Sequence, residues 1–247
     1  MIRVCVAGIT GWTGSAVAAA VREAADLDLV AGVARADPAS LSSVAEALEA
    51  IDTDVLVDYT HPSIVRENVL AALDRRVGVV VGTSGLSAAD YDEIDAAAEQ
   101  ASVGVIAAGN FAIGAALLLR FATEAARHLP AWEVIDYASA TKPDAPSGTA
   151  RELAERLGPS VIALPLDDVV GARDARGASI AGTQVHSLRL PSFVVSTEIV
   201  FAGEGERLTI RHDAGDSAGP YVAGTLLAIR AVVDRVGLTR GLDRLLA

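Results

Sequence analysis

The segment from Thr141 to Ala150 holds the chain's most distinctive chemistry, because its Lys142 is the only lysine among 20 lysine and arginine residues. A lysine ammonium is compact and can release a proton, whereas an arginine guanidinium stays charged. A site that binds an anion and also moves a proton therefore needs the lysine. We predict that Lys142 binds substrate and acts in catalysis; the alternative is a surface lysine beside a helix cap.

The residues after Lys142 predict a rigid approach to a helix. Two prolines restrict the backbone before Ser147, Gly148 and Thr149 open a helical stretch. The free N–H groups and the positive dipole end of a helix start attract carboxylates and phosphates. The segment thus predicts a binding site for a small anionic substrate. Helix capping would explain Ser147, but not the prolines, the glycine and the only lysine together.

A second anion site is predicted near the N-terminus, where Gly8, Gly11 and Gly14 follow an apolar run and precede a helical stretch. Glycines at this spacing permit a tight turn and let a pyrophosphate approach backbone N–H groups, as in dinucleotide-binding folds. The sequence therefore predicts a bound dinucleotide. The predicted contacts in this loop also include Thr10, Trp12 and Thr13.

The end of the second apolar run bears on which dinucleotide binds. NAD-binding folds usually place an acidic residue there for the ribose 2′-hydroxyl. This chain has Ala34 and then Arg35, so a guanidinium is available for a 2′-phosphate. We predict NADPH in preference to NADH, which would also fit; the alternative is a solvated Arg35.

Two polar loops follow later strand-like runs and are expected at the ligand-binding edge of a doubly wound sheet. Their small residues and one amide suit the nicotinamide ribose and carboxamide, although ordinary turns would use the same residue types. The predicted contacts are Gly82, Thr83, Ser84, Gly109, Asn110 and Phe111.

Apolar periodicity predicts the elements that must position these residues. Strand-like runs alternate with helical stretches in the first half, which predicts an α/β fold with a Rossmann-like, doubly wound parallel sheet. The strands are expected at 2–7, 27–33, 55–59, 77–81 and 103–107, and the helices at 15–25, 63–74 and 88–100. Ser87 and Asp90 have the spacing of a capping box.

The second half has a different order, which predicts a second α+β domain with a mixed sheet. Helices are expected at 114–129, 147–157 and 221–236, and strands at 132–138, 184–189, 193–202 and 206–213. We predict a dinucleotide-binding domain at 1–109, completed by 215–247, and a second domain at 110–214.

Composition and charge disfavour several classes of partner, although general solubility would also explain the charge. The 247 residues carry a net charge of −12, which disfavours nucleic acid and anionic membranes as partners. A lone cysteine, Cys5, and the lack of a signal-peptide pattern or long apolar run predict a cytoplasmic protein. No metal site is predicted.

The segment Lys142-Pro-Asp-Ala-Pro-Ser-Gly-Thr-Ala150 closely resembles the signature of the 4-hydroxy-tetrahydrodipicolinate reductase (dihydrodipicolinate reductase) family of bacterial lysine biosynthesis. The resemblance covers nearly the whole chain. It extends to segments 8–14, 57–62, 82–85, 109–114, 185–190 and 208–213.

The resemblance implies a Rossmann-like domain completed by the C-terminal helix, and a second domain that binds substrate and builds a homotetramer. It implies NAD(P)H-dependent reduction of a cyclic, imine-conjugated dicarboxylate. Carried over by position, Lys142 and 147–149 would bind that substrate. Arg35 and the glycine loop would bind the cofactor, with Tyr59 and Thr60 added to its contacts.

The chain departs from the family pattern where two histidines usually precede the loop, because Ala138 and Ser139 stand there. The family pattern follows Arg189 with a glycine and a histidine, and Ser192 and Ser196 stand at the positions that resemble them. Ser217 stands near a position where the family often has an arginine. General acid catalysis contributes typically about 10²–10⁴-fold to a rate, so the loss is serious. Lys142, water or Tyr137 would then supply the proton.

Three functions remain open at this point. The chain reduces the family's substrate, or it is a diverged paralogue that reduces a less anionic imine, enamine or activated alkene. The third is a protein that binds NADPH without turnover.

Overall fold

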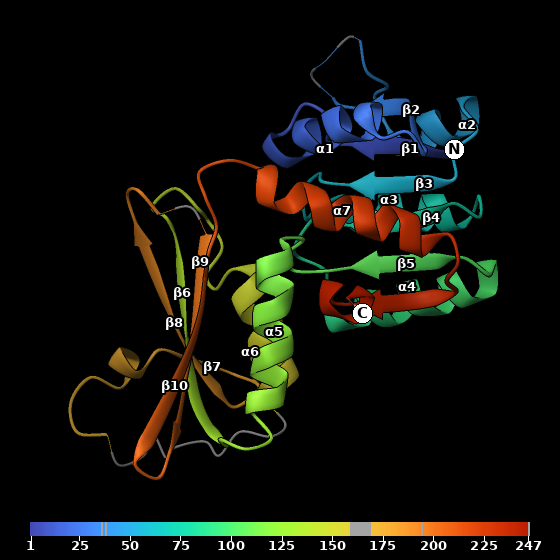
Figure 1. Cartoon of the computed structure of the whole chain (residues 1–247). Coiled ribbons are helices and arrows are strands. Elements are labelled where there is room, and N and C mark those ends of the chain that lie inside the picture. Colours follow the sequence, from blue (N-terminus) through green and yellow to red (C-terminus); the bar gives the residue numbers. More distant parts are fainter. Residues whose placement is uncertain (36, 38, 159–168, 194, 247) are drawn as a thin grey trace. The chain divides into compact units, whose positions relative to one another are not determined.

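A computed structural model describes residues 1–35, 37, 39–158, 169–193 and 195–246. These residues form two compact units (Figure 1), Met1–Ile113 with Ala218–Ala247, and Gly114–Ser217. The C-terminal segment therefore belongs to the same unit as the N-terminal half. The functions that we assigned to the two domains stay predictions.

The first unit is built on a parallel sheet in the order β11-β5-β4-β3-β1-β2. This confirms the predicted Rossmann-like, doubly wound fold. Its strands are β1 (Ile2–Ala7), β2 (Leu27–Val33), β3 (Val55–Asp58), β4 (Gly78–Val81), β5 (Gly104–Ala107) and β11 (Gly237–Arg240). Its helices are α1 (Trp12–Glu23), α2 (Val44–Ala50), α3 (Val65–Leu73), α4 (Ala88–Ala101) and α7 (Gly219–Val232), with a 3₁₀ turn at Leu242–Leu245.

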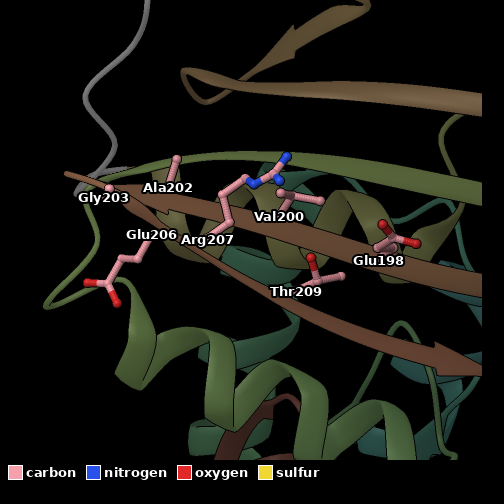
Figure 2. Close-up of a pocket in the computed structure, with 8 residues that line it drawn as sticks. Glu198, Val200, Ala202, Gly203, Glu206, Arg207 and Thr209 are labelled. Atoms are coloured by element: carbon pink, nitrogen blue, oxygen red, sulfur yellow. The ribbon is translucent and has the colours of Figure 1, made fainter.

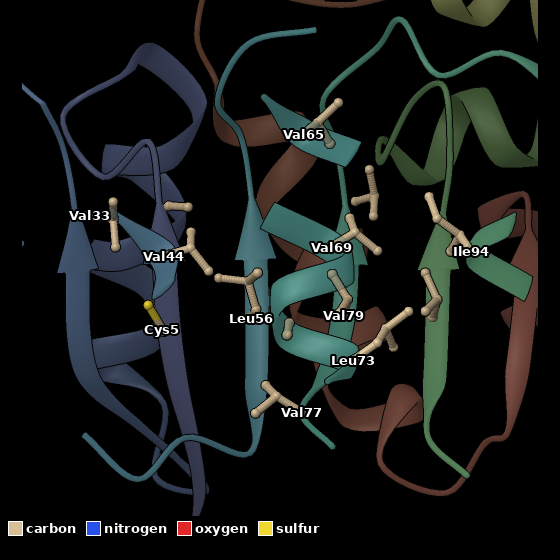
Figure 3. Packing of buried hydrophobic residues seen from close by; sticks show 14 of the residues in the cluster. Cys5, Val33, Val44, Leu56, Val65, Val69, Leu73, Val77, Val79 and Ile94 are labelled. Carbon is tan, nitrogen blue, oxygen red and sulfur yellow. The ribbon is translucent and has the colours of Figure 1, made fainter. Parts of the chain in front are cut away.

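The core of the first unit explains why its central strands are continuous apolar runs. Every residue of β3, β4 and β5 is buried, as expected for parallel strands covered by helices on both faces. Figure 3 shows side chains of these strands packed with those of the neighbouring helices, for example Leu56 and Val79 near Val69 and Leu73. Such packing fixes the strand ends from which the ligand-binding loops emerge.

The second unit contains a mixed sheet in the order β10-β9-β6-β8-β7, in which β6 and β8 run parallel and the other pairs antiparallel. The predicted second α+β fold is thus confirmed. Its strands are β6 (Ala131–Ser139), β7 (Ala178–Ile180), β8 (Thr183–Leu190), β9 (Val195–Gly203) and β10 (Glu206–Asp213). Its helices are α5 (Ile113–Ala125) and α6 (Gly148–Leu157), with a 3₁₀ turn at Arg173–Arg176.

Strict alternation along β6 gives the second sheet two different faces. Trp132, Val134, Asp136 and Ala138 are buried on the face that packs against α5 and α6, and the intervening residues are partly exposed. We call these the inner and outer faces of the sheet. Asp136 is the acidic residue of the inner set.

The sequence patterns missed three short elements, α2, β7 and β11. The predicted helix at 221–236 ends at Val232, and β11 follows it from Gly237. The capping box of α4 is present as predicted, since Ser87 accepts from the Asp90 N–H and Asp90 accepts from the Ser87 N–H.

Candidate active site

The strands of the first unit end level with one another. Ala7 pairs with Asp58, Asp58 with Val81, and Val81 with Ala107. The loops that follow these residues therefore emerge at one edge of the sheet, the carboxyl edge, where doubly wound folds bind ligands. The predicted residues from Gly8 to Gly14, at Tyr59 and Thr60, from Gly82 to Ser84 and from Gly109 to Phe111 all lie there.

Two glycines of the loop, Gly8 and Gly14, have no space for a Cβ atom. Gly8 adopts φ +82°, and a Cβ there would lie 2.2 Å from the Tyr59 carbonyl oxygen. A Cβ on Gly14 would lie 2.1 Å from the Gly8 carbonyl oxygen. The loop thus brings backbone close to backbone at the start of α1.

The N-terminus of α1 is open to a ligand. Its N-cap residue is Gly11, and no side chain there accepts a hydrogen bond from the first turn. Free N–H groups and the positive end of the helix dipole suit a phosphate. The residues present therefore fit the pyrophosphate of a dinucleotide.

Arg35 is exposed and directly follows the buried Ala34 at the end of β2. Two residues further on, the Asp37 carboxylate accepts from the Ser40 hydroxyl at 2.7 Å and from the Ala39 N–H at 3.1 Å. Asp37, Ser40 and Thr10 line a depression of about 420 Å³ beside β2. The sequence reasoning stopped at Arg35 and did not consider this carboxylate.

Asp58 organises the middle of the carboxyl edge, and the sequence reasoning gave it no role. It is completely buried. Its Oδ1 accepts from the Thr83 hydroxyl at 2.6 Å and the Thr60 hydroxyl at 2.7 Å, and its Oδ2 accepts from the Asn68 amide at 2.8 Å. The Thr60 N–H in turn donates to the Thr83 hydroxyl at 2.7 Å. One carboxylate thus holds two of the predicted cofactor loops together, and an acidic residue ending an apolar strand was the available signal.

An aromatic and hydroxyl chain joins α7 to this edge. The Thr225 hydroxyl donates to the Tyr221 carbonyl at 2.8 Å, so the Tyr59 hydroxyl, 2.6 Å away, donates to Thr225. The Tyr59 ring meets Phe111 edge-on at 6.2 Å, and Trp12 meets Tyr221 in the same way at 5.8 Å. Burial raises the pKa of Tyr59. Tyr59 therefore packs as a neutral side chain among the predicted cofactor residues.

Cys5 lies in the core beneath these loops and takes no part in them. It is fully buried, and burial, assisted by the nearby Asp58 charge, raises its thiol pKa to about 12. A thiol in this state is a poor nucleophile.

In the second unit, the predicted substrate loop places a cation a few residues before a helix start. Lys142 is 28% exposed, and its Nζ lies 2.6 Å from Asp144 Oδ1. Its backbone N–H donates to the Ser139 carbonyl at 3.0 Å. The ammonium is thus partly sheltered and paired with a carboxylate of its own loop. A ligand carboxylate would compete with that partner.

Ser147 serves the cap of α6. The side chain is 2% exposed, and its hydroxyl accepts from the Ala150 N–H at 3.3 Å. Its own N–H donates to Asp136 at 2.9 Å. Gly148 and Thr149 remain partly exposed. The assignment of residues 147–149 to substrate binding stays a prediction, with Ser147 already occupied by the protein.

Asp136 and Arg189 lie directly under this loop, and the sequence reasoning missed both. Asp136 is completely buried, and its Oδ2 accepts from Arg189 at 2.8 Å and from the Ser187 hydroxyl at 3.1 Å. Burial would raise the Asp136 pKa, but hydrogen bonds from Ser147 and Arg189 outweigh burial and hold it below its ordinary value. Asp136 is therefore an anion here. The sequence signal that could have identified Asp136 is an acidic residue at a core-facing position of an alternating strand.

At the positions where the family pattern has histidines, the side chains present here are either buried or hydrogen bonded within the protein. Ala138 is fully buried, and the Ser139 hydroxyl lies 3.0 Å from the Thr141 hydroxyl. Ser196 hydrogen bonds to Asp213. None of these three side chains offers an acid suited to neutral pH.

Tyr137 lies on the outer face, away from Asp136. Its hydroxyl donates to Glu198 at 3.3 Å, its ring stacks on Phe193 at 5.4 Å, and Arg211 lies over it at 4.8 Å. Burial and the Glu198 charge raise the Tyr137 pKa. This tyrosine is consequently a weak candidate for the proton donor.

The outer face carries a separate depression of about 840 Å³ between β9 and β10 (Figure 2). It contains no residue that we predicted to bind substrate or cofactor. Its lining residues are Glu198, Val200, Ala202, Gly203, Gly205, Glu206, Arg207 and Thr209.

The described residues contain no cluster of histidine, cysteine and acidic side chains that could hold a metal ion. None of their helices combines the length and apolar character needed to span a membrane.

Comparison with known proteins gives matches along the full chain. Residues 2–111 match the model of the dihydrodipicolinate reductase N-terminus, and residues 114–246 match that of the C-terminus. The 4-hydroxy-tetrahydrodipicolinate reductases of Cutibacterium acnes and Nocardia farcinica are 39% and 42% identical to this chain. The first match covers 100% of this chain and 99% of the relative, and the second 98% and 97%.

A solved structure is also similar over its whole length. Dipicolinate-bound dihydrodipicolinate reductase from Paenisporosarcina sp. TG-14 superimposes with a TM-score of 0.82 at 30% identity, covering 100% of both chains.

Proposed function

The chain belongs to the dihydrodipicolinate reductase family, and from this premise we propose that it reduces a cyclic, imine-conjugated dicarboxylate in lysine (diaminopimelate) biosynthesis. The observation that carries the proposal is the loop of Lys142. A partly sheltered ammonium stands before the start of α6, where two residues remain partly exposed. Such a pair suits a carboxylate.

A pyridine nucleotide is the cofactor of this oxidoreductase family, and we propose NADPH, with NADH as the alternative. Gly8, Gly11 and Gly14 would hold the pyrophosphate and Arg35 the 2′-phosphate. The loops joined by Asp58 would border the nicotinamide, with Tyr59 and Phe111 packed behind them. When bound, the nicotinamide supplies a hydride to an acceptor carbon.

The protein's own contribution is positioning and charge. Lys142 and the N–H groups at the start of α6 would fix a substrate carboxylate, which limits the poses from which reaction occurs. The Lys142 ammonium can also release a proton, which an arginine in its place would not do. We therefore assign Lys142 both roles, with Asp144 holding the ammonium until the substrate arrives.

A second candidate is reduction of a less anionic imine, enamine or activated alkene by a diverged paralogue. The specific observation in its favour is that alanine or serine stands at positions 138, 139 and 196, where the family pattern has histidines. Ala138 is buried, while Ser139 and Ser196 are hydrogen bonded within the protein. A pocket with fewer cationic groups favours a substrate with fewer negative charges.

The deciding experiment is a cofactor-oxidation assay. The purified chain is mixed with NADPH or NADH and the product of the lysine-pathway aldolase, in parallel with cyclic imines and unsaturated acids. We expect oxidation with the aldolase product. Oxidation only with less anionic compounds would favour the paralogue. Tight cofactor binding with no oxidation in any mixture would mean a binding protein without turnover.

We also propose a homotetramer in the cytoplasm, built through the outer face of the second sheet, with a small-molecule anion as the only other partner. β10 is the edge strand of that sheet, and its outer-face residues Arg207 and Thr209 are exposed. Exposed strand edges of this kind are commonly covered by association.

A further inference from the structure

The strand register of the second unit lines up polar residues on the inner face of the sheet. His212 pairs with Thr197, Thr197 with Asp136, and Asp136 with Ser187. The next inward row on the side of the core is apolar and consists of Ile210, Ile199, Val134 and Val185. The polar row therefore marks the end of the apolar core, at the level where Asp136 receives the N–H of Ser147.

This row is poorly explained as a device for stability. Asp136 Oδ1, Arg189 Nε and Thr197 Oγ1 are all buried and have no hydrogen-bond partner among the described residues. Each such atom is costly, and a buried ion pair is often no better for stability than apolar side chains of similar volume. Fold stability therefore does not explain why the chain has this buried Asp136–Arg189 ion pair.

What the ion pair does hold is the substrate loop. Arg189 Nη2 donates to Asp136 Oδ2 at 2.8 Å and also to the Asp144 carbonyl at 2.7 Å. Asp136 receives the Ser147 N–H on the same oxygen. The pair therefore contacts the loop at two points, one near Lys142 and one at the cap of α6.

Arg189 is not free to bind a substrate anion. Its Nη1 donates to the carbonyls of Leu188 at 2.9 Å and Asp136 at 3.4 Å, and its Nη2 donates to the Asp136 carboxylate and the Asp144 carbonyl. Only Nε remains, and it is buried. The charge of this arginine is directed inward, at Asp136.

We propose that Asp136 and Arg189 are positioning residues, which set the conformation of residues 142–149 in which Lys142 and the start of α6 bind one anion. The proposal rests on the proposed function only for the identity of that anion. The hydrogen bonds to the Asp144 carbonyl and the Ser147 N–H are independent of it.

The first test follows the loop itself and uses no substrate. Amide hydrogen exchange is measured across residues 140–157 in the wild-type chain, Asp136→Asn and Arg189→Lys. We expect faster exchange at 144–150 in both variants, because each loses or weakens one contact to the loop. Glu133→Gln is the matched control, since Glu133 also lies on β6 but pairs with Arg176 and His186, outside the loop.

The second test measures affinity and turnover. Titration with dipicolinate, the ligand named for the Paenisporosarcina structure, should show weaker binding in Asp136→Asn and an intermediate loss in Arg189→Lys. A small misplacement far from the reacting atoms can cost about 10²-fold in rate, so we expect a fall in kcat/KM of about 10- to 100-fold. Glu133→Gln should match wild type in both measurements.

The outcomes separate the two proposals. Unchanged loop exchange in both variants would overturn the positioning role, as would losses in Glu133→Gln as large as those in Asp136→Asn. Faster loop exchange in a chain whose wild type does not bind dipicolinate would support the positioning role and reject the dicarboxylate. If Asp136→Asn does not fold, Arg189→Lys and Asp136→Glu keep both charges and carry the test.

Discussion

At position 142, lysine and arginine would bind the same anion but would do different chemistry. The partly sheltered Lys142 ammonium is held at 2.6 Å by Asp144. Loss of a general acid or of a charge that orients substrate typically costs about 10²–10⁴-fold in rate. We predict that Lys142→Ala lowers kcat/KM at least about 10²-fold, and that Lys142→Arg restores KM more than kcat. Steady-state kinetics measures this, and equal turnover in Lys142→Ala and wild type would remove Lys142 from the mechanism.

Arg35 should decide between the two nicotinamide cofactors. It is exposed at the end of β2, and the Asp37 carboxylate that follows is engaged by Ser40 and the Ala39 N–H. We expect Arg35→Ala to raise the Kd of NADPH about 10-fold or more while that of NADH changes little, because only NADPH has the 2′-phosphate. Quenching of Trp12 fluorescence, or calorimetry, would give both constants. An equal change for both cofactors would contradict the assignment.

The sequence was most informative where a residue's chemistry follows from its type and near neighbours. Lys142 is singular in composition, and the three glycines have a spacing with a steric reason that the structure bears out at Gly8 and Gly14. Asp136 and Arg189 were missed because their meaning depends on strand register. They are 53 residues apart along the chain and meet only because β8 lies beside β6.

At the level of elements, the turn into α1 can form only because residue 14 is a glycine and has no Cβ atom. A Cβ on Gly14 would lie 2.1 Å from the Gly8 carbonyl oxygen, so Gly14→Ala must displace backbone. We predict a loss of stability of about 1–3 kcal/mol from overpacking and a clear weakening of dinucleotide binding. Gly215→Ala is the control, because a Cβ there meets nothing within 4 Å. Thermal unfolding with and without NADPH would measure both effects.

His212 links β10 to the start of α5 and gives the second unit a pH dependence. The His212 ring packs against Gly114, because a Cβ on that glycine would lie only 2.6 Å from His212 Cδ2. Burial lowers the pKa of His212. The folded chain then binds a proton here less readily than the unfolded chain. The stabilising contribution is therefore present above the unfolded pKa of about 6.5 and is lost as the pH falls below it.

The corresponding prediction compares stability at two pH values. Between about pH 7 and pH 5, wild type should lose more unfolding free energy than His212→Gln, which cannot take up this proton. Urea denaturation at each pH would measure the difference. Identical slopes in the two proteins would show that His212 titrates alike in the folded and unfolded states. His128→Gln is the control, since His128 is exposed with a side chain 72% accessible.

The elements that the sequence missed share a physical cause. The long apolar periods of α4 and α5 were found, and five strands of the first sheet, β1 to β5, were found within a residue or two at their ends. β11 spans only Gly237–Arg240 and exists because it pairs with β5, more than a hundred residues earlier in the chain. Neither its length nor its polar residues mark it as a strand before that partner is known.

For the whole molecule, the outer face of the second sheet is the surface through which we propose that the chain assembles. On the outer face, Val200 pairs with Thr209 across β9 and β10, and both line the depression shown in Figure 2. Because Val200 points away from the inner core, a charge there should disturb association and leave the fold intact. We predict that Val200→Asp shifts the protein from tetramer to smaller species in sedimentation velocity, with a far-ultraviolet circular dichroism spectrum like that of wild type.

The control for that experiment is Thr209→Ser, which changes the same depression by one methyl group and should remain tetrameric. Burying an added carboxylate in a subunit interface is costly, so the proportion of smaller species should rise and should depend on protein concentration. A Val200→Asp protein that stays tetrameric at every concentration would place the assembly surface elsewhere. A wild-type chain that sediments as a monomer would instead contradict the homotetramer itself, and the exposed β10 edge would then need another explanation.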